Sequence, residues 1–234
     1  MTKLILLDAY AIIYRSYYAL LRTPRINSKG LNTSAIMGFC NTLHEVLTKE
    51  QPDYIGLAFD HGKTFRHEKY PAYKAQRQET PEDIKRSVPI IQDILGALRI
   101  PVLQKDGFEA DDVIGTLAHQ ADEMGILNYM LNPDKDYGQL IADNVKMYKP
   151  RHGGGYDIIG KEEVQQKYGI ATPAQVIDLL ALMGDSADNF PGCPGVGEKT
   201  AVKLINQFGS VANLLESSDQ LKGKMKEKVM NATE

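Results

Sequence analysis

The sequence predicts an α/β protein with a mostly parallel sheet flanked by helices, followed by a smaller helical part. Short apolar runs alternate with segments of helical periodicity over residues 1–160, which is the pattern of a parallel sheet covered by helices on both faces. From residue 161 onward only short helical segments follow. We therefore expect an α/β core over residues 1–160 and a helical lobe over residues 161–234.

The first half of the core begins with the apolar run KLILLD at residues 3–8, which predicts a buried strand. Residues 10–21 have helical periodicity, and a loop containing Pro24, Asn27 and Gly30 follows. Thr33 or Ser34 can cap a second helix that extends to about residue 49. Residues 53–60 predict a second strand, whereas residues 61–81 are polar and basic and have no clear period.

The second half of the core continues the alternation. Residues 81–98 and 109–124 predict helices, and residues 100–104 and 126–132 predict strands. Val113, Ile114 and Leu117 are expected to anchor the second of these helices in the core. Residues 145–150 and 155–160 flank a run of glycines at 153–155, which predicts a hairpin. The lobe is expected to contain helices at residues 161–169, 172–184, 197–209, 210–216 and 221–230.

The composition is that of an ordinary globular protein, with 43% hydrophobic and 24% charged residues in 234. There is no apolar run of transmembrane length and no signal-peptide pattern, so we expect a cytoplasmic protein. Cys40 and Cys193 lack metal-site spacing and are expected to be free thiols. The net charge of −3 argues weakly against nucleic-acid binding, but basic residues gather at 63–86 and 222–228, away from short acidic clusters.

Acidic residues occur where predicted strands end and where helices begin. Asp8, Asp60 and Asp134 follow three strands, and ligand sites of parallel sheets lie at the carboxyl ends of the strands. A further acidic run opens the helix at 109–124, and two more aspartates are spaced three apart in GDSADN. The candidate metal ligands are Asp8, Glu109, Asp111, Asp112, Asp134, Asp136, Asp185 and Asp188.

Several carboxylates that converge without basic neighbours repel each other, and hard divalent cations relieve the repulsion. Oxygen ligands with few histidines favour Mg²⁺ or Mn²⁺, and two such ions about 4 Å apart can promote phosphodiester hydrolysis. A single aspartate is more often a helix cap or a solvated side chain. That simpler interpretation fits Asp60 best, which we expect to support the site more than to hold metal.

The stretch GCPGVGEKTA at residues 192–201 nearly matches a nucleotide P-loop, but Glu198 interrupts the motif and the preceding segment is a predicted helix. A glycine turn between helices instead suits a nucleic-acid phosphate, with Lys199 and Thr200 placed to help. A plain helix–turn–helix with glycine for steric reasons is the alternative. The predicted metal-dependent phosphodiester site favours phosphate binding.

Three motifs carry a family resemblance: GFEADDVIGTLA at 107–118, PDKDYGQL at 133–140 and MGDSADNFPGCPGVGEKTA at 183–201. LLDAYAIIYRSYYAL at 6–20 and FDHGKTFRHEKYPAYKAQR at 59–77 extend it. The chain resembles the 5′ nuclease domains of bacterial DNA polymerases I, in the flap endonuclease family. The resemblance covers nearly the whole chain. It implies a PIN-like fold with an arch at about residues 61–82 and a helix–three-turn–helix lobe of the helix-hairpin-helix kind.

The resemblance also implies activity and residue roles. The implied activity is two-metal hydrolysis at 5′ ends and 5′ flaps of DNA, and of RNA primers, in replication and repair. The eight acids above match the family's metal ligands, and K⁺ can be held by backbone carbonyls of the glycine turn. The implied catalytic residues are Lys74, Asp60 and Arg77. The implied DNA-binding residues are Arg15, Arg66, Tyr73, Lys74, Arg77, Gly192, Gly195, Gly197, Lys199 and Thr200.

The chain departs from the family pattern at Asn132 and Pro133, where a small residue and glycine are usual, and Pro133 removes a backbone donor. In the family the helix at residues 10–21 lies near the active site, but Tyr10, Tyr14 and Tyr17 have the spacing of core residues, which favours core packing over base stacking. The resemblance also implies that the chain is a fragment truncated in its lobe. The implied partner is a polymerase domain, and the expected protein is a monomer with no membrane contact, near the bacterial nucleoid.

Two other functions stay open from the sequence. A non-catalytic DNA-junction binder with the same fold would lack some of the acids, and none is missing. A PIN-type ribonuclease would need neither the arch nor the glycine-rich lobe.

Overall fold

The computed structural model describes residues 1–151 and 155–231. The chain divides into two compact units. The α/β unit comprises Met1–Phe65, Gln78–Pro133 and Asn144–Ile158, and the helical unit comprises Arg66–Arg77, Asp134–Asp143 and Ile159–Glu234. The helical unit therefore includes two segments, 66–77 and 134–143, that the chain inserts between parts of the α/β unit.

The α/β unit is built on a six-stranded sheet with the order β3-β2-β1-β4-β5-β6. The strands are β1 (Lys3–Asp8), β2 (Tyr54–Ala58), β3 (Val102–Leu103), β4 (Leu127–Leu131), β5 (Val145–Pro150) and β6 (Tyr156–Ile159). β1 pairs in parallel with β2 and β4, β2 with β3, and β4 with β5. The predicted, mostly parallel sheet is thus confirmed. Residues 153 and 154 of the predicted hairpin turn lie outside the described residues.

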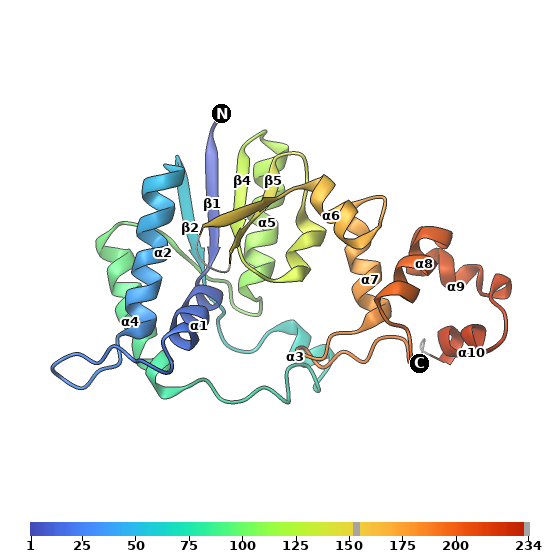
Figure 1. Ribbon diagram of the computed structural model, residues 1–234, viewed down its shortest axis with the longest axis horizontal. Coiled ribbons are helices and arrows are strands. Elements are labelled where there is room, and N and C mark those ends of the chain that lie inside the picture. The colour runs from blue at the N-terminus through green and yellow to red at the C-terminus, as the bar shows by residue number, and fades with distance from the viewer. Residues whose placement is uncertain (152–154, 232–234) are drawn as a thin grey trace. The chain divides into compact units, whose positions relative to one another are not determined.

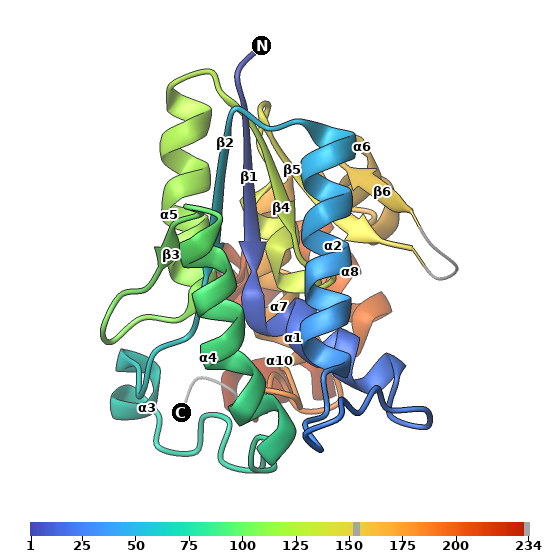
Figure 2. The same cartoon turned by 90° about the vertical axis from the view of Figure 1, so that its left-hand side faces the viewer.

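Helices cover both faces of this sheet (Figures 1 and 2). α1 (Ala9–Ala19), α2 (Ser34–Glu50) and α4 (Glu82–Ala97) form one layer, and α5 (Ala110–Glu123) packs against β1, β2, β4 and β5. The main core cluster joins Ile5 and Leu7 of β1 to Phe39 of α2 and Ile91 of α4. Because side chains alternate along a strand, Leu6 points to the opposite face. The β-α alternation of the sequence therefore produces two hydrophobic layers around β1.

The buried face of α5 differs in part from the prediction. Ile114 is fully buried, as expected, but the rest of the buried face consists of the alanines at 110, 118 and 121. Val113 and Leu117 are only half-buried, so the prediction that they anchor the helix in the core was wrong for these two residues. Small residues on the buried face let the helix lie close to the sheet, which fixes the position of its acidic N-terminus.

The start of α2 also differs from the prediction. Thr33 occupies the N-cap position but its side chain makes no capping hydrogen bond. The Thr33 hydroxyl donates to the carbonyl of Arg25 at 2.8 Å, and the Ser34 hydroxyl accepts from the N–H of Arg25 at 2.9 Å. Thr33 is therefore the N-cap residue, as predicted, but both side chains close the preceding loop and neither gives the helix a side-chain cap.

The helical unit contains short elements. They are η1 (Lys135–Leu140), α6 (Lys161–Tyr168), η2 (Pro173–Gln175), α7 (Val176–Met183), α8 (Glu198–Phe208), α9 (Val211–Glu216), η3 (Ser218–Gln220) and α10 (Lys224–Asn231). α7 packs against α8 and η1, and α8 packs against α9. Leu179 of α7 with Ala201 and Ile205 of α8 are among the buried residues. A further helix that the sequence did not predict, α3 (Phe65–Lys69), lies in the polar and basic stretch.

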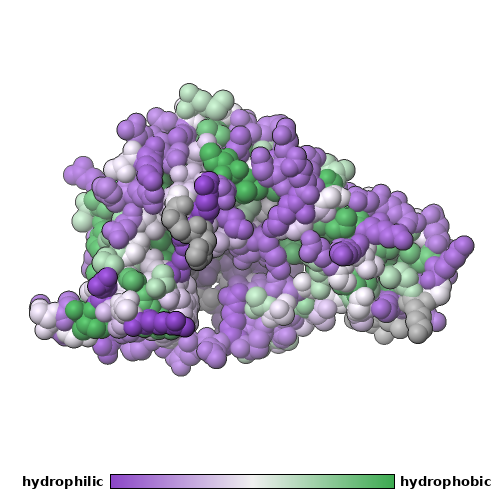
Figure 3. All heavy atoms as spheres, in the orientation of Figure 1, coloured by the Kyte–Doolittle hydropathy of each residue, from purple (hydrophilic) through white to green (hydrophobic). Residues whose placement is uncertain are grey.

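The surface view in Figure 3 shows a mainly hydrophilic face on which hydrophobic residues occur in separate patches. Among residues 1–151 and 155–231, none of the helices has both the length and the apolar character needed to cross a membrane.

Two glycines close the loop between α7 and α8. Gly192 has φ of 61°, and a Cβ atom there would lie 2.3 Å from the backbone nitrogen of Gly184. We expect Gly192→Ala to lower the free energy of unfolding by about 3 kcal/mol, because strain at positive φ adds to a backbone clash. Gly197→Ala is the matched control, since nothing lies within 4 Å of its Cβ position, and it should cost under about 1 kcal/mol. Equal losses in urea unfolding would contradict this account.

Candidate active site

Asp8 lies at the end of β1 and is held by both neighbouring elements. Its Oδ1 accepts from the N–H of Ala11 at 2.9 Å, which caps α1, and its Oδ2 accepts from Asn132 Nδ2 at 2.9 Å. Burial raises the pKa of Asp8 to about 7 against the lowering effect of the Ala11 N–H, and the charges of Asp111 and Asp60 raise it further. A nearby cation would stabilise the ionised form of such an acid and lower its pKa again.

The remaining candidate acids of the α/β unit lie at or contact the N-terminus of α5. Asp112 accepts from the N–H of Glu109 at 2.9 Å, and Asp60 accepts from the N–H of Ala110 at 2.7 Å. These carboxylates satisfy helix donors that have no partner within the helix, and the helix dipole favours their charge. The first acid group is defined as Asp8, Asp60, Glu109, Asp111 and Asp112.

In this group the simple interpretation of an aspartate as a helix cap is correct for Asp60, which is exposed. Its bond to the N–H of Ala110 lies at the start of the acidic helix, and its supporting role in the site stays a prediction. Glu109 is 6% exposed. Its buried carboxylate lies at the N-cap position of α5, where it forms a capping box with Asp112.

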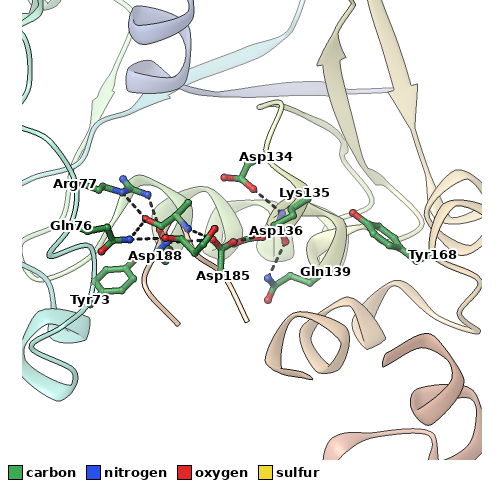
Figure 4. A network of polar contacts seen from close by, with 12 residues as sticks. Tyr73, Gln76, Arg77, Asp134, Lys135, Asp136, Gln139, Tyr168, Asp185 and Asp188 are labelled. Carbon is green, nitrogen blue, oxygen red and sulfur yellow. Dashed lines mark hydrogen bonds and ion pairs between the residues drawn. The ribbon is translucent and has the colours of Figure 1, made fainter. Parts of the chain in front are cut away.

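The second acid group, in the helical unit, is defined as Asp134, Asp136, Asp185 and Asp188 (Figure 4). Asp134 accepts from the N–H of Asp136 at 3.1 Å and caps η1. Burial raises the pKa of Asp136 to about 6; Asp134 raises it, Lys135 lowers it, and Asp185 and Asp188 raise it further. The Oδ1 atom of Asp136 is buried and accepts no hydrogen bond from the described residues.

Asp185 is paired with a basic side chain from η1. Lys135 Nζ lies 2.8 Å from Asp185 Oδ2, and the N–H of Ala187 donates to Asp185 Oδ1 at 2.7 Å. Burial by itself raises the pKa of Asp185, but the bonds from Lys135 and Ala187 lower it below its usual value. The carboxylate is therefore held in its ionised form by a cation that the chain itself supplies.

Asp188 is paired in the same way with the segment 66–77. Arg77 Nη2 donates to Asp188 Oδ1 at 2.6 Å, and the hydroxyl of Tyr73 donates to Oδ2 at 3.1 Å (Figure 4). Tyr73 is 2% exposed and packs on His67 and Phe190. Lys74 has φ of 55°, and its Nζ lies 4.8 Å from the centroid of the Tyr73 ring. Arg77 and Tyr73, both predicted to contact DNA, thus donate hydrogen bonds to the carboxylate of Asp188.

The donor chemistry of both groups fits a hard divalent cation, because every ligand candidate is a carboxylate oxygen and Asp136 offers a buried oxygen without a hydrogen-bond partner among the described residues. The described residues contain no three His, Cys, Asp or Glu side chains placed so that they could hold a metal ion. Backbone N–H groups, Asn132, Lys135 and Arg77 engage several of the carboxylates instead. The metal assignments stay predictions.

The remaining predicted DNA-binding residues lie in both units. Arg15 is exposed on α1, whereas Tyr10, Tyr14 and Tyr17 pack against the main core cluster. Core packing of these tyrosines is thereby confirmed. In the helical unit Arg66 is half-buried in α3.

The glycine turn is largely open. Gly195, Gly197 and Lys199 are exposed, and Gly197 is the N-cap residue of α8. The N–H of Thr200 donates to the Gly197 carbonyl at 3.0 Å. Gly192 is half-buried, because it meets Gly184 closely. The turn thus has accessible backbone beside the start of an 11-residue helix.

Sequence reasoning missed two residues that contact these groups. Asn132 was noted only as a departure from a pattern, yet the pairing of Leu7 with Leu131 places Asn132 next to Asp8. Strand register could therefore have identified it. Lys135 lies between two acids in the sequence, and no pattern indicated that its partner would be Asp185, 50 residues away.

Two family models match successive parts of the chain. Residues 3–169 match the family model of the 5′-3′ exonuclease N-terminal resolvase-like domain, and residues 171–234 match that of the 5′-3′ exonuclease C-terminal SAM fold. DNA polymerase I of Bacillus caldotenax is 44% identical over 229 residues, which cover 96% of this chain and 26% of that protein. The chain thus spans about a quarter of the length of this curated relative.

Solved structures show the same fold. A complex of the bacteriophage T5 flap endonuclease with DNA and metal ions has a TM-score of 0.76 at 21% identity, covering 99% of this chain and 84% of that chain. The catalytic core of Rad2 in complex with a DNA substrate has a TM-score of 0.60 at 19% identity, covering 100% of this chain and 74% of that chain. From its matches along both units, the chain belongs to the 5′-3′ exonuclease family.

Proposed function

We propose that this chain is a divalent-metal-dependent, structure-specific 5′ nuclease that hydrolyses phosphodiesters at 5′ ends and 5′ flaps of DNA and of RNA primers. The observation that carries the proposal is the crowding of carboxylates in a chain of the 5′-3′ exonuclease family. Burial, and after it the charges of neighbouring acids, raise the pKa of Asp8 to about 7 and that of Asp136 to about 6. Divalent cations would neutralise both groups.

The metal ligands in this proposal are Asp8, Glu109, Asp111 and Asp112 of the first acid group and all four aspartates of the second. Mg²⁺ or Mn²⁺ suits oxygen ligands of this kind. Held by these carboxylates, two or more cations would supply an activated water and stabilise the leaving oxygen of the phosphodiester. Asn132 orients Asp8 through its 2.9 Å hydrogen bond, and Asp60 fixes the start of α5.

Basic residues bind the substrate in this proposal. Lys74 and Arg77 contact the scissile phosphate, and Arg15 and Arg66 contact other phosphates of the strand. Tyr73 belongs to the same segment and contacts the DNA strand in this proposal, as the family resemblance implies. The glycine turn holds a duplex phosphate through Gly192, Gly195, Gly197, Lys199 and Thr200. Its backbone carbonyls hold K⁺.

The proposal also covers the partner, the substrate and the cellular setting of this chain. Relatives named DNA polymerase I are about four times as long as this chain, so the proposed partner is a polymerase domain on the same polypeptide. The structural neighbours named above were solved with DNA, and we propose DNA with a 5′ flap or a single-strand/double-strand junction as the substrate. The proposed setting is the bacterial cytoplasm at the nucleoid, with the protein as a monomer, in primer removal and repair. The proposed domain limits are 1–160, with the arch at 61–82, and 161–234.

The test is cleavage of a 5′-flap DNA, an unbranched duplex and an unstructured RNA with Mg²⁺ and with a chelator. We expect metal-dependent cleavage of the flap near the junction. Equal junction binding with and without metal, and no cleavage, would support a junction-binding protein instead. Preferred cleavage of unstructured RNA would support a ribonuclease of the PIN type.

DNA affinity is expected to fall as the salt concentration rises. With five proposed phosphate contacts, the logarithm of the binding constant should fall with the logarithm of the salt concentration at a slope of about −4. Lys199→Ala should reduce that slope by about one unit, because it removes one phosphate contact. Lys161→Ala is the control, since Lys161 pairs with Asp143 at 2.6 Å. A flat salt response would contradict the proposed contacts.

A further inference from the structure

Both aspartates of the GDSADN loop are held by the chain's own cations. Lys135 Nζ lies 2.8 Å from Asp185 Oδ2, and Arg77 Nη2 lies 2.6 Å from Asp188 Oδ1. The two carboxylates are mostly covered, with side-chain exposures of 17% and 19%. Figure 4 shows both basic side chains reaching the aspartates from opposite sides.

Other ion pairs of the chain provide a comparison. Arg151 pairs with Asp157 at 2.7 Å and Lys161 with Asp143 at 2.6 Å, and these carboxylates are 47% and 83% exposed. The cations themselves are equally accessible in both sets, at 52% for Arg77 and 58% for Arg151, and 42% for both lysines. These two sets therefore differ in the exposure of their acids, although Glu50, which pairs with Lys3 at 3.0 Å outside the acid groups, is covered to the same degree at 18% exposure.

The segment 66–77 is joined to the same loop by further contacts. The N–H of Lys74 donates to the Asp188 carbonyl at 3.2 Å, and Gln76 Nε2 donates to the Ser186 carbonyl at 2.6 Å. The rings of Tyr70 and Phe190 stack at 5.3 Å. The Arg77 ion pair is thus the charged part of a larger contact between this segment and residues 186–190.

We propose that Arg77 and Lys135 are internal counterions that compete with divalent cations for Asp188 and Asp185, and so set the metal affinity of the second acid group. The inference rests on the proposed metal role of these two aspartates. Four neighbouring carboxylates repel each other, and the two cations offset that repulsion when metal is absent. Binding of a divalent cation to Asp188 displaces Arg77 and frees it for a substrate phosphate.

Energetics favour such an exchange. Ion pairs whose cation is exposed to water contribute little to stability, so that a divalent cation with several carboxylate ligands can displace them. The carboxylates are occupied by basic groups and must be released before they can act as ligands.

The test measures Mn²⁺ binding to the folded chain by electron paramagnetic resonance of free Mn²⁺, for the variants Arg77→Met and Lys135→Met. Each should bind Mn²⁺ about two- to fivefold more tightly than the wild type, because the metal no longer has to break an ion pair. Arg77→Lys keeps the positive charge, and its Mn²⁺ affinity should lie within about twofold of that of the wild type. Arg151→Met and Lys161→Met are the matched controls and should leave the affinity unchanged.

A second measurement follows the segment itself. Hydrogen exchange of the backbone N–H groups at residues 70–77 should become faster when Mg²⁺ is added to the wild type. In Arg77→Met exchange should already be fast without metal. Unchanged or slower exchange on metal addition would overturn the displacement of Arg77.

The metal role of the second acid group and the competition by Arg77 and Lys135 give different results when they are wrong. If the wild type binds no Mn²⁺, or if Asp188→Asn leaves every binding event intact, the proposed metal role of this group fails. If the wild type binds Mn²⁺ through Asp188 but Arg77→Met and Lys135→Met bind equally or more weakly, the competition is overturned and the nuclease proposal stands.

Discussion

Replacing Asp112 or Asp185 with asparagine is expected to reduce the rate of flap cleavage by about a thousandfold, because a catalytic cation contributes several kcal/mol to transition-state stabilisation. Asparagine keeps the volume of the side chain. Its amide oxygen can still accept the backbone N–H that the aspartate accepts, which is that of Glu109 at 2.9 Å for Asp112 and that of Ala187 at 2.7 Å for Asp185. The fold should therefore persist. Affinity for flap DNA should change by less than about threefold, since the phosphate contacts are made by other residues.

The measurement is single-turnover cleavage of a labelled flap, together with binding of the same flap in the presence of Ca²⁺. Asp157→Asn is the control, because Asp157 forms an ion pair with Arg151 at 2.7 Å outside either acid group. Circular dichroism and a thermal melt establish that each variant is folded. Wild-type cleavage rates in folded Asp112→Asn and Asp185→Asn would remove both acids from the proposed site.

The second large effect is a pH-dependent stabilisation by metal. The folded pKa values of Asp8, about 7, and Asp136, about 6, lie above the ordinary value of 3.8. The folded state therefore holds extra protons, and the stability that they provide is complete below about pH 4 and is lost as the pH rises through these values. Saturating Mg²⁺ should raise the Tm by about 5 °C at pH 8 and by less than half of that at about pH 5.5, where protons compete for the carboxylates.

Differential scanning fluorimetry with Mg²⁺ or with a chelator at both pH values measures this effect. Asp136→Asn removes a buried charge whose Oδ1 accepts no hydrogen bond from the described residues. It should raise the Tm of the metal-free protein at pH 8 and reduce the shift that metal produces. An equal metal shift at the two pH values would contradict the link between the raised pKa values and metal binding.

Much of the fold could be predicted from the sequence because its signals are local. Apolar runs such as residues 3–8 and 127–131 are long enough to specify strands, and their alternation with helices implies parallel pairing. The acids at strand ends and helix starts were likewise found from sequence, since the carboxyl end of a strand and the first turn of a helix are defined by position along the chain. Weaker local signals failed, as at Thr33 and at α3, where tertiary contacts or irregular sequence decided the outcome.

The sequence by itself determined which carboxylates this protein carries and which elements present them. Only the tertiary structure decided what each carboxylate contacts: Asn132 on Asp8, Lys135 on Asp185 and Arg77 on Asp188. These partners are separated by 124, 50 and 111 positions in the chain. Pattern and propensity act over a few residues, whereas such contacts depend on strand register and on packing within each unit. For that reason the carboxylates were predictable, and the groups that each of them contacts were not.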